Sequence, residues 1–292
     1  MDTTAGAQHD TGPDQDKGRS GRGGRIGPVV RSPLGWMLTG MVGVGLVSGL
    51  TATGPGPVPV LGAAAAVAVY WAVMRFVARR PTPEIARRGA GRQALLGGAI
   101  GLGFILVSTI LISAFGGYSF SWADNGFLSV VWSAVVAQLG AAVTEELMFR
   151  GFALQALEEM WGSRAAVVIT GVFFGIAHLS APGASAWSAV AIAVEAGAML
   201  GASFLWRRNI WFVVGLHFVW NTVEQLLGIP VSGHTPEGLF TVDTHGPALL
   251  TGGTFGLETS IVPILISVLI TVRMAVRARR SGGLLPRRSA RH

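Results

Sequence analysis

The stretch AAVTEELMFRGF, residues 141–152, places three charged side chains inside an apolar part of the chain. Glu145, Glu146 and Arg150 belong to the apolar segment 127–160, which can cross a bilayer because a spanning helix needs about 20 residues. A charge at the bilayer centre costs about 2.5–3.5 kcal/mol on insertion scales, so such residues are functional candidates by default. The stretch therefore predicts a membrane-spanning helix that carries a functional site.

The whole chain has the composition of a multi-pass membrane protein. Of its 292 residues, 50% are hydrophobic and only 13% are charged, and its mean hydropathy is +0.53. Soluble domains, in contrast, are about one quarter charged. Segments of spanning length predict an all-α integral membrane fold of about eight transmembrane helices, at 34–53, 58–78, 93–116, 127–160, 164–181, 185–206, 210–228 and 257–276.

The arginines predict the orientation of these spans. Basic residues occupy the N-terminal tail, the 75–92 connection, positions 164 and 207–208, and the C-terminal run from 273. The alternate connections TATGPGPVP, GGYSFSWADNG, LSAPGASA and 229–256 contain neither Lys nor Arg. Apart from Arg150, every basic residue thus falls on one side of the membrane. The positive-inside rule therefore predicts that both termini are cytoplasmic. Topology thus accounts for the net charge of +7, and we expect no nucleic-acid partner.

The spans divide the chain into five expected parts. These are a disordered basic cytoplasmic tail (1–33), accessory transmembrane helices (34–126), a core that carries the candidate site (127–228), an extracytoplasmic loop (229–256), and a last span with a basic cytoplasmic tail (257–292). Glycines four residues apart, such as Gly97 and Gly101, predict close helix packing. The absence of cysteine excludes disulfides. The use of Arg almost to the exclusion of Lys indicates a GC-rich genome and a bacterial plasma membrane.

Helix geometry predicts that Glu145 and His178 face one another. Counted from the turn at 158–164 at about 1.5 Å per residue, Glu145 lies about 25 Å along one helix and His178 about 24 Å along the next. Glu146 and Arg150, at spacing i and i+4, are expected to form an ion pair. That pair has mainly a structural role, and it leaves Glu145 as the unpaired carboxylate.

A third segment adds further polar candidates. His217 and Asn221, also four residues apart, share one helix face and are expected to join the pocket. A lone histidine in a span is more often a packing residue than a catalyst, so the hypothesis depends on the whole set. Two roles are equally expected for Glu195: a hydrogen bond to another helix, or a place in the site. Glu224, near the outer end of its span, is expected to face water.

Three short motifs carry a family resemblance. EELMFR (145–150), FGIAH (174–178) and HFVWN (217–221) resemble the signatures EExxxR, FxxxH and HxxxN of the CPBP family. This family comprises the type II CAAX prenyl endopeptidases and the bacterial bacteriocin-processing and self-immunity proteins. The resemblance covers roughly residues 127–226, without a departure at the motif positions.

The resemblance implies an intramembrane glutamic endopeptidase. Glu145 would be the general base that activates water with His178, while His217 and Asn221 would donate to the oxyanion. Glu146 and Arg150 would support the site. A metal-dependent alternative would use Glu145, His178 and His217 as zinc ligands with an open position. We favour the mechanism without a metal or other cofactor, because HExxH is absent and an amide such as that of Asn221 is a poor zinc ligand.

The expected substrate is a membrane-associated peptide or a lipidated protein, which need not be prenylated. Two other functions compete with this one. A non-catalytic immunity or scaffold protein of the same family would bind a peptide or partner in the same cavity, but would not need all four polar residues. A proton-coupled transporter would also use intramembrane Glu and His. The chain, however, has no internal hydropathy repeat of the commonest transporter design.

Overall fold

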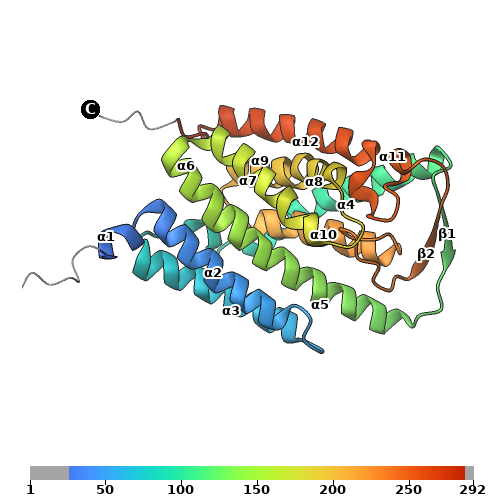
Figure 1. The fold of residues 1–292 in the computed structure, drawn as a ribbon, viewed down its shortest axis with the longest axis horizontal. Helices are drawn as coiled ribbons and strands as arrows, with labels where there is room; N and C mark the ends of the chain where they lie inside the picture. The colour runs from blue at the N-terminus through green and yellow to red at the C-terminus, as the bar shows by residue number, and fades with distance from the viewer. Residues whose placement is uncertain (1–25, 287–292) are drawn as a thin grey trace, which may run out of the picture.

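The computed structural model describes residues 26–286, and it consists mostly of long helices (Figure 1). The longest elements are α2 (Pro33–Thr51), α3 (Val58–Ala72, extended by the π-helical η2, Val73–Val77), α4 (Ala90–Ala114), α5 (Phe127–Glu146), α7 (Ser163–Ala177), α10 (Ile210–Leu226) and α12 (Ile261–Arg280). α5 continues through the π-helical η4 (Leu147–Leu154) into α6 (Gln155–Trp161). α8 (Ala186–Ile192) continues through the π-helical η6 (Ala193–Ala198) into α9 (Met199–Arg207).

Seven helices are long and apolar enough to cross a membrane, by length and composition alone, among the residues that the structure describes. They coincide with seven of the eight predicted spans, and their ends differ from the predicted ones by a few residues. The eighth prediction corresponds to α10, which has 17 residues and is slightly shorter than the other seven. The chain is therefore a multi-pass helical membrane protein, and the count of eight stays a prediction.

Shorter elements connect the long helices. They are α1 (Ile26–Val30), the 3-10 turns η3 (Pro83–Ile85), η5 (His178–Ser180) and η7 (Leu257–Thr259), α11 (Ala248–Thr251), and two strands. Of the N-terminal tail predicted to be disordered, residues 1–25 lie outside the described residues, and 26–30 form α1. Residues 287–292 of the C-terminal tail also lie outside them.

The bundle has two different ends (Figure 1). One end, here called the arginine end, holds the connections 78–89, 162 and 208–209 together with the C-terminal end of α12, and α1 lies there as well. The opposite end, here called the loop end, holds the connections 52–57, 115–126, 181–185 and 227–260. The arginine-bearing and arginine-free connections are thus separated in space. Their placement relative to a membrane stays a prediction.

The loop end contains a sheet that the sequence analysis did not predict. β1 (Tyr118–Trp122) pairs antiparallel with β2 (Phe240–Thr244), with Phe120 opposite Val242. The two segments, YSFSW and FTVDT, alternate apolar and polar residues, which is the strand pattern. Their separation along the chain hid the pairing, because each was interpreted as part of a loop. The sheet ties residues 229–256 to the α4–α5 connection.

Close glycine contacts hold α10 against α4. A Cβ atom on Gly97 would lie 1.9 Å from the Phe212 carbonyl oxygen, and one on Gly101 would lie 2.3 Å from that of Leu216. Real Cβ atoms do not approach so closely, so both positions require glycine for this packing. The predicted packing role of this pair is confirmed, and it fixes the helix that carries His217.

Candidate functional site

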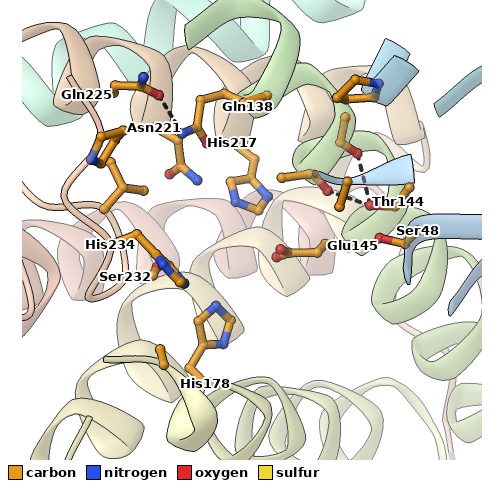
Figure 2. A pocket seen from close by; sticks show the side chains of 18 of the residues that line it. Ser48, Gln138, Thr144, Glu145, His178, His217, Asn221, Gln225, Ser232 and His234 are labelled. Carbon is orange, nitrogen blue, oxygen red and sulfur yellow. Dashed lines mark hydrogen bonds between the residues drawn. The ribbon is translucent and has the colours of Figure 1, made fainter. Parts of the chain in front are cut away.

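A cavity of about 900 Å³ lies between α5, α7 and α10 (Figure 2). Its volume is within the range of about 300–1,000 Å³ that is usual for ligand pockets. The predicted residues Glu145, His178, His217 and Asn221 all line this cavity, so the structure brings together the set that the sequence analysis proposed. Glu146 and Arg150 lie beside it without lining it.

Glu145 extends from the last turn of α5 into the cavity (Figure 2). Its Oε2 atom is buried and has no hydrogen-bond partner among the described residues. A buried polar atom without a partner is costly in a native protein and calls for an explanation, such as a catalytic role or a bound water. This carboxylate is thus available to a water molecule or a substrate.

His178 forms the end of α7 and begins the short turn η5. Its Nδ1 atom lies 2.7 Å from the Phe174 carbonyl oxygen. A carbonyl oxygen can only accept a hydrogen bond, so Nδ1 carries the proton and the neutral ring presents a lone pair at Nε2. The Phe174 ring packs against the imidazole, with centroids 4.7 Å apart, and limits its orientation.

Glu146 does more than neutralise Arg150. Its Oε1 atom accepts from Arg150 Nη1 at 3.0 Å and also from His217 Nδ1 at 2.8 Å. Glu146 is fully buried and His217 is 4% exposed, so water competes little for this contact. The predicted ion pair is present, but it belongs to a triad that also orients the His217 ring. The sequence analysis missed this link because it joins two helices 71 positions apart.

Arg150 holds the π-helical segments together. Its Nη2 atom donates to the carbonyl oxygens of Ala196 and Gly197 in η6, at 3.0 and 3.3 Å. Its guanidinium also lies over the Phe174 ring, 4.8 Å from the centroid. π-helical turns leave some carbonyl groups without their usual partners and often occur at functional sites. Arg150 supplies such partners and fixes η4, the segment that follows Glu146.

Asn221 and two glutamines continue the polar wall toward the loop end. Gln138 Nε2 donates to Gln225 Oε1 at 2.9 Å, which joins α5 to α10 above the site (Figure 2). Gln138 lies seven positions before Glu145, and Gln225 four positions after Asn221, so both spacings indicate shared helix faces. The same periodicity that identified Asn221 could have identified them.

Glu195 and Glu224 are both fully buried. The expectation that Glu224 faces water is wrong, because residues 227–260 fold over the end of α10. Its Oε2 atom accepts from Trp220 Nε1 at 2.9 Å, and its carboxyl group lies next to that of Glu258. Glu195 has no hydrogen-bond partner among the described residues and does not line the cavity, so it meets neither of its two expectations.

Glu258 precedes the last candidate span, Ile261–Arg280, and anchors part of the long loop over the cavity. Its Oε1 atom accepts from the backbone nitrogen and the hydroxyl of Ser232, at 2.7 and 3.0 Å. Burial raises the pKa of Glu258 above its ordinary value. The anchored loop brings Ser232 and His234 to the cavity (Figure 2). No sequence signal placed these two residues there, because loop geometry has no periodicity.

The donor set does not favour a metal site. Among residues 26–286, no three His, Asp or Glu side chains lie close enough to share a metal ion. Both histidines use Nδ1 for other contacts and could offer only Nε2. The proposed zinc ligands Glu145, His178 and His217 thus line one cavity without forming a ligand cluster. We derive no step through a metal, and metal independence stays a prediction.

The fold and the cavity define a helical, multi-pass membrane protein with a carboxylate and histidine site. Residues 127–223 match the family model described as type II CAAX prenyl endopeptidase Rce1-like. The predicted CPBP resemblance is confirmed for this segment, which contains the three motifs. Neither the curated proteins nor the solved structures contain a match to this chain.

Proposed function

We propose that this protein is an intramembrane endopeptidase that hydrolyses a peptide bond of a membrane-associated or lipidated polypeptide. The observation that carries the proposal is the convergence of Glu145, His178, His217 and Asn221 from three helices on one cavity, with Glu145 Oε2 left unpartnered. In this proposal Glu145 takes a proton from water, and the hydroxide attacks the scissile carbonyl carbon.

His178 would assist Glu145 through Nε2. The bond from Nδ1 to the Phe174 carbonyl oxygen leaves Nε2 as an acceptor in the neutral ring. Nε2 can bind the attacking water, receive the proton that Glu145 has taken from it, and pass this proton to the leaving amine. Such positioned proton transfer typically contributes about 10²–10⁴-fold in rate.

His217 and Asn221 would stabilise the oxyanion. Because Nδ1 of His217 donates to Glu146, a hydrogen bond from Nε2 to the oxyanion requires the imidazolium form. An imidazolium beside two carboxylates is electrostatically favourable. With Glu145 and Glu146 ionised, Arg150 and His217 would bring the formal charge of the site to zero. Glu146 is then the positioning residue for His217.

The proposal also covers location and cofactors. The protein would reside in a bacterial plasma membrane with eight spans, counting α10, and would need no metal. Its partners would be the lipid bilayer and the peptide substrate. Because Glu145, His178 and His217 do not form a ligand cluster among the described residues, the proposal assigns no step to a metal.

The test is cleavage of a quenched-fluorescent peptide library by the purified protein in detergent, with and without a chelator. Glu145→Gln should lower kcat/KM by about 10³–10⁴-fold, and His178→Ala by about 10²–10³-fold. Matched controls are Asp243→Asn and His245→Ala on or beside β2, which should leave the rate unchanged because both residues lie outside the cavity lining.

Two results would contradict the proposal. If wild type cleaves no peptide, or if Glu145→Gln cleaves as fast as wild type, the function is not that of a Glu145-dependent protease. If a chelator abolishes cleavage and zinc restores it, the mechanism is metal-dependent. Peptide binding without cleavage would instead support the scaffold alternative.

A further inference from the structure

The cavity receives its rim from one end of the bundle only. Beyond the helix residues, its lining comes from 51–53, 180–181 and 231–237, which belong to or border the connections of the loop end. None of the connections of the arginine end, at 78–89, 162 and 208–209, contributes a lining residue. A peptide can therefore approach Glu145 from the loop end.

Packed side chains close the other direction. Phe149 and Phe174 meet edge to face with centroids 4.8 Å apart, and Arg150 lies over the Phe174 ring. The three side chains are at most 8% exposed. Farther toward the arginine end, Gln155 joins Tyr70 and the Gly151 carbonyl oxygen through hydrogen bonds of 3.0 and 2.8 Å. A peptide from that end would have to disrupt these layers.

The lining contains two carboxyl groups besides the buried Glu258: Glu145 at the centre of the site, and the exposed Glu237 in the long loop. It also contains three imidazoles, but no Lys or Arg among the described residues. A peptide cleaved a few residues from its carboxyl terminus would bring that carboxylate into the cavity, where His217 is already paired with Glu146 and no Lys or Arg can receive it. Like charges repel most strongly where water is excluded. Basic residues near the scissile bond would instead be attracted, most directly by the exposed Glu237.

We infer that the substrates are polypeptide segments exposed on the membrane face opposite to the arginine-rich connections, with neutral or basic residues around the scissile bond. By the positive-inside rule that face is extracytoplasmic. The inference rests on the proposed peptidase function. It excludes the cytoplasmic carboxyl-terminal tail of a lipidated protein as the natural substrate.

The absence of cysteine makes the sidedness directly testable, because a single introduced thiol is unique. Thr53→Cys places a thiol at the exposed rim of the cavity, and Ser281→Cys places one at the arginine end. A membrane-impermeant maleimide should label Thr53→Cys in intact cells and Ser281→Cys only in inverted vesicles. The reverse pattern would overturn the inference whether or not the protein is an enzyme.

The charge preference is tested with internally quenched peptides of one apolar core flanked by Lys, Gln or Glu pairs, each with a free or an amidated carboxyl terminus. Right-side-out vesicles should cleave them, and kcat/KM for the Glu-flanked peptide should be about tenfold below that for the Lys-flanked one. Glu237→Gln should narrow this difference, and Glu145→Gln gives the background rate.

The outcomes separate the two proposals. Cleavage in detergent but only by inverted vesicles would refute the sidedness and leave the peptidase function intact. A preference for Glu-flanked or free-acid peptides would refute the charge selection. If the solubilised protein cleaves none of the peptides, the peptidase function fails and this substrate assignment fails with it, while the labelling still locates the mouth of the cavity.

Discussion

Buried carboxyl groups have different partners at the two ends of this bundle. At the arginine end, Glu158 binds Arg208 through two contacts, of 2.5 and 2.7 Å, and also accepts a hydrogen bond from Ser163. Toward the loop end, Oε2 of Glu145 has no hydrogen-bond partner among the described residues, and the carboxyl groups of Glu224 and Glu258 face one another.

The paired carboxylate at the arginine end holds helices together, whereas the unpartnered oxygen at the cavity is free to bind a ligand. A fully paired carboxylate contributes to a fixed geometry and has no capacity for a further ligand. An unpartnered buried carboxyl oxygen costs stability, and a bound water, proton or substrate relieves that cost. We therefore expect substitutions at the arginine end to change folding, and substitutions at the cavity to change catalysis.

The largest effect expected from this contrast is a loss of rate at the cavity. Asn221→Ala removes the proposed oxyanion donor and should lower kcat by about 10²–10³-fold, with a change in the free energy of unfolding of only about 1 kcal/mol. Peptide cleavage and thermal unfolding in detergent measure the two effects. Asn125→Ala, in a loop-end connection outside the cavity lining, is the matched control. An equal loss of rate in both variants would remove Asn221 from the site.

The opposite effect is expected at the arginine end. Arg208→Ala leaves the buried Glu158 carboxylate without its cation and should lower the free energy of unfolding by about 3 kcal/mol. The kcat of the folded fraction should stay as in wild type. Arg164→Ala, an exposed residue at the same end, serves as the control. A fall in kcat without a fall in Tm would show that this end contributes to the chemistry.

Glu146→Gln tests whether a buried residue outside the cavity lining acts on catalysis through its contact with His217. The amide can still accept from His217, but it no longer favours the imidazolium, so kcat should fall by about 10²-fold, as for the loss of one oxyanion donor. The alkaline limb of the kcat profile should move to lower pH, which a purely structural role would not cause. Glu84→Gln, a buried glutamate bonded to Tyr70 at the arginine end, should leave the position of that limb unchanged.

The smallest effect is expected where the loop is anchored. Because burial raises the pKa of Glu258, its contribution to stability is complete below the ordinary glutamate pKa and is lost as pH rises through the raised one. Glu258→Gln should remove this pH dependence, with a change of about 1 kcal/mol or less. Unfolding midpoints between acid and mildly alkaline pH measure it, with the exposed Glu237→Gln as the control. Parallel curves for wild type and Glu258→Gln would refute it.

The helical fold could largely be predicted from the chain, for a physical reason. Lipid demands continuous apolar segments, and seven such segments reappear as helices with nearly the predicted ends. The contact of Gly97 with α10 was also predictable, since only a small residue permits backbones to approach so closely. The β1–β2 pair was not, because its strands are far apart in sequence and nothing local pairs them.

In the site, the regular spacing of helix residues predicted which side chains share a face. Contacts between residues far apart in the sequence could not be predicted in this way. The rise of a helix brought Glu145 level with His178, and the i, i+4 rule grouped His217 with Asn221, as the shared cavity confirms. The same rules predicted that Glu146 binds only Arg150 and that Glu224 is exposed to solvent. Both conclusions changed when a second helix or a folded loop came into contact.

Residue types, their order and helical periodicity were thus sufficient to predict the membrane class, the family resemblance of residues 127–223 and the residues that line the cavity. Only the tertiary structure decided that Glu146 orients His217, and that the long loop covers Glu224 and brings His234 to the cavity. The reason is physical. Periodicity is a property of one helix, whereas the direction in which a cavity opens depends on how several helices and their connections pack together.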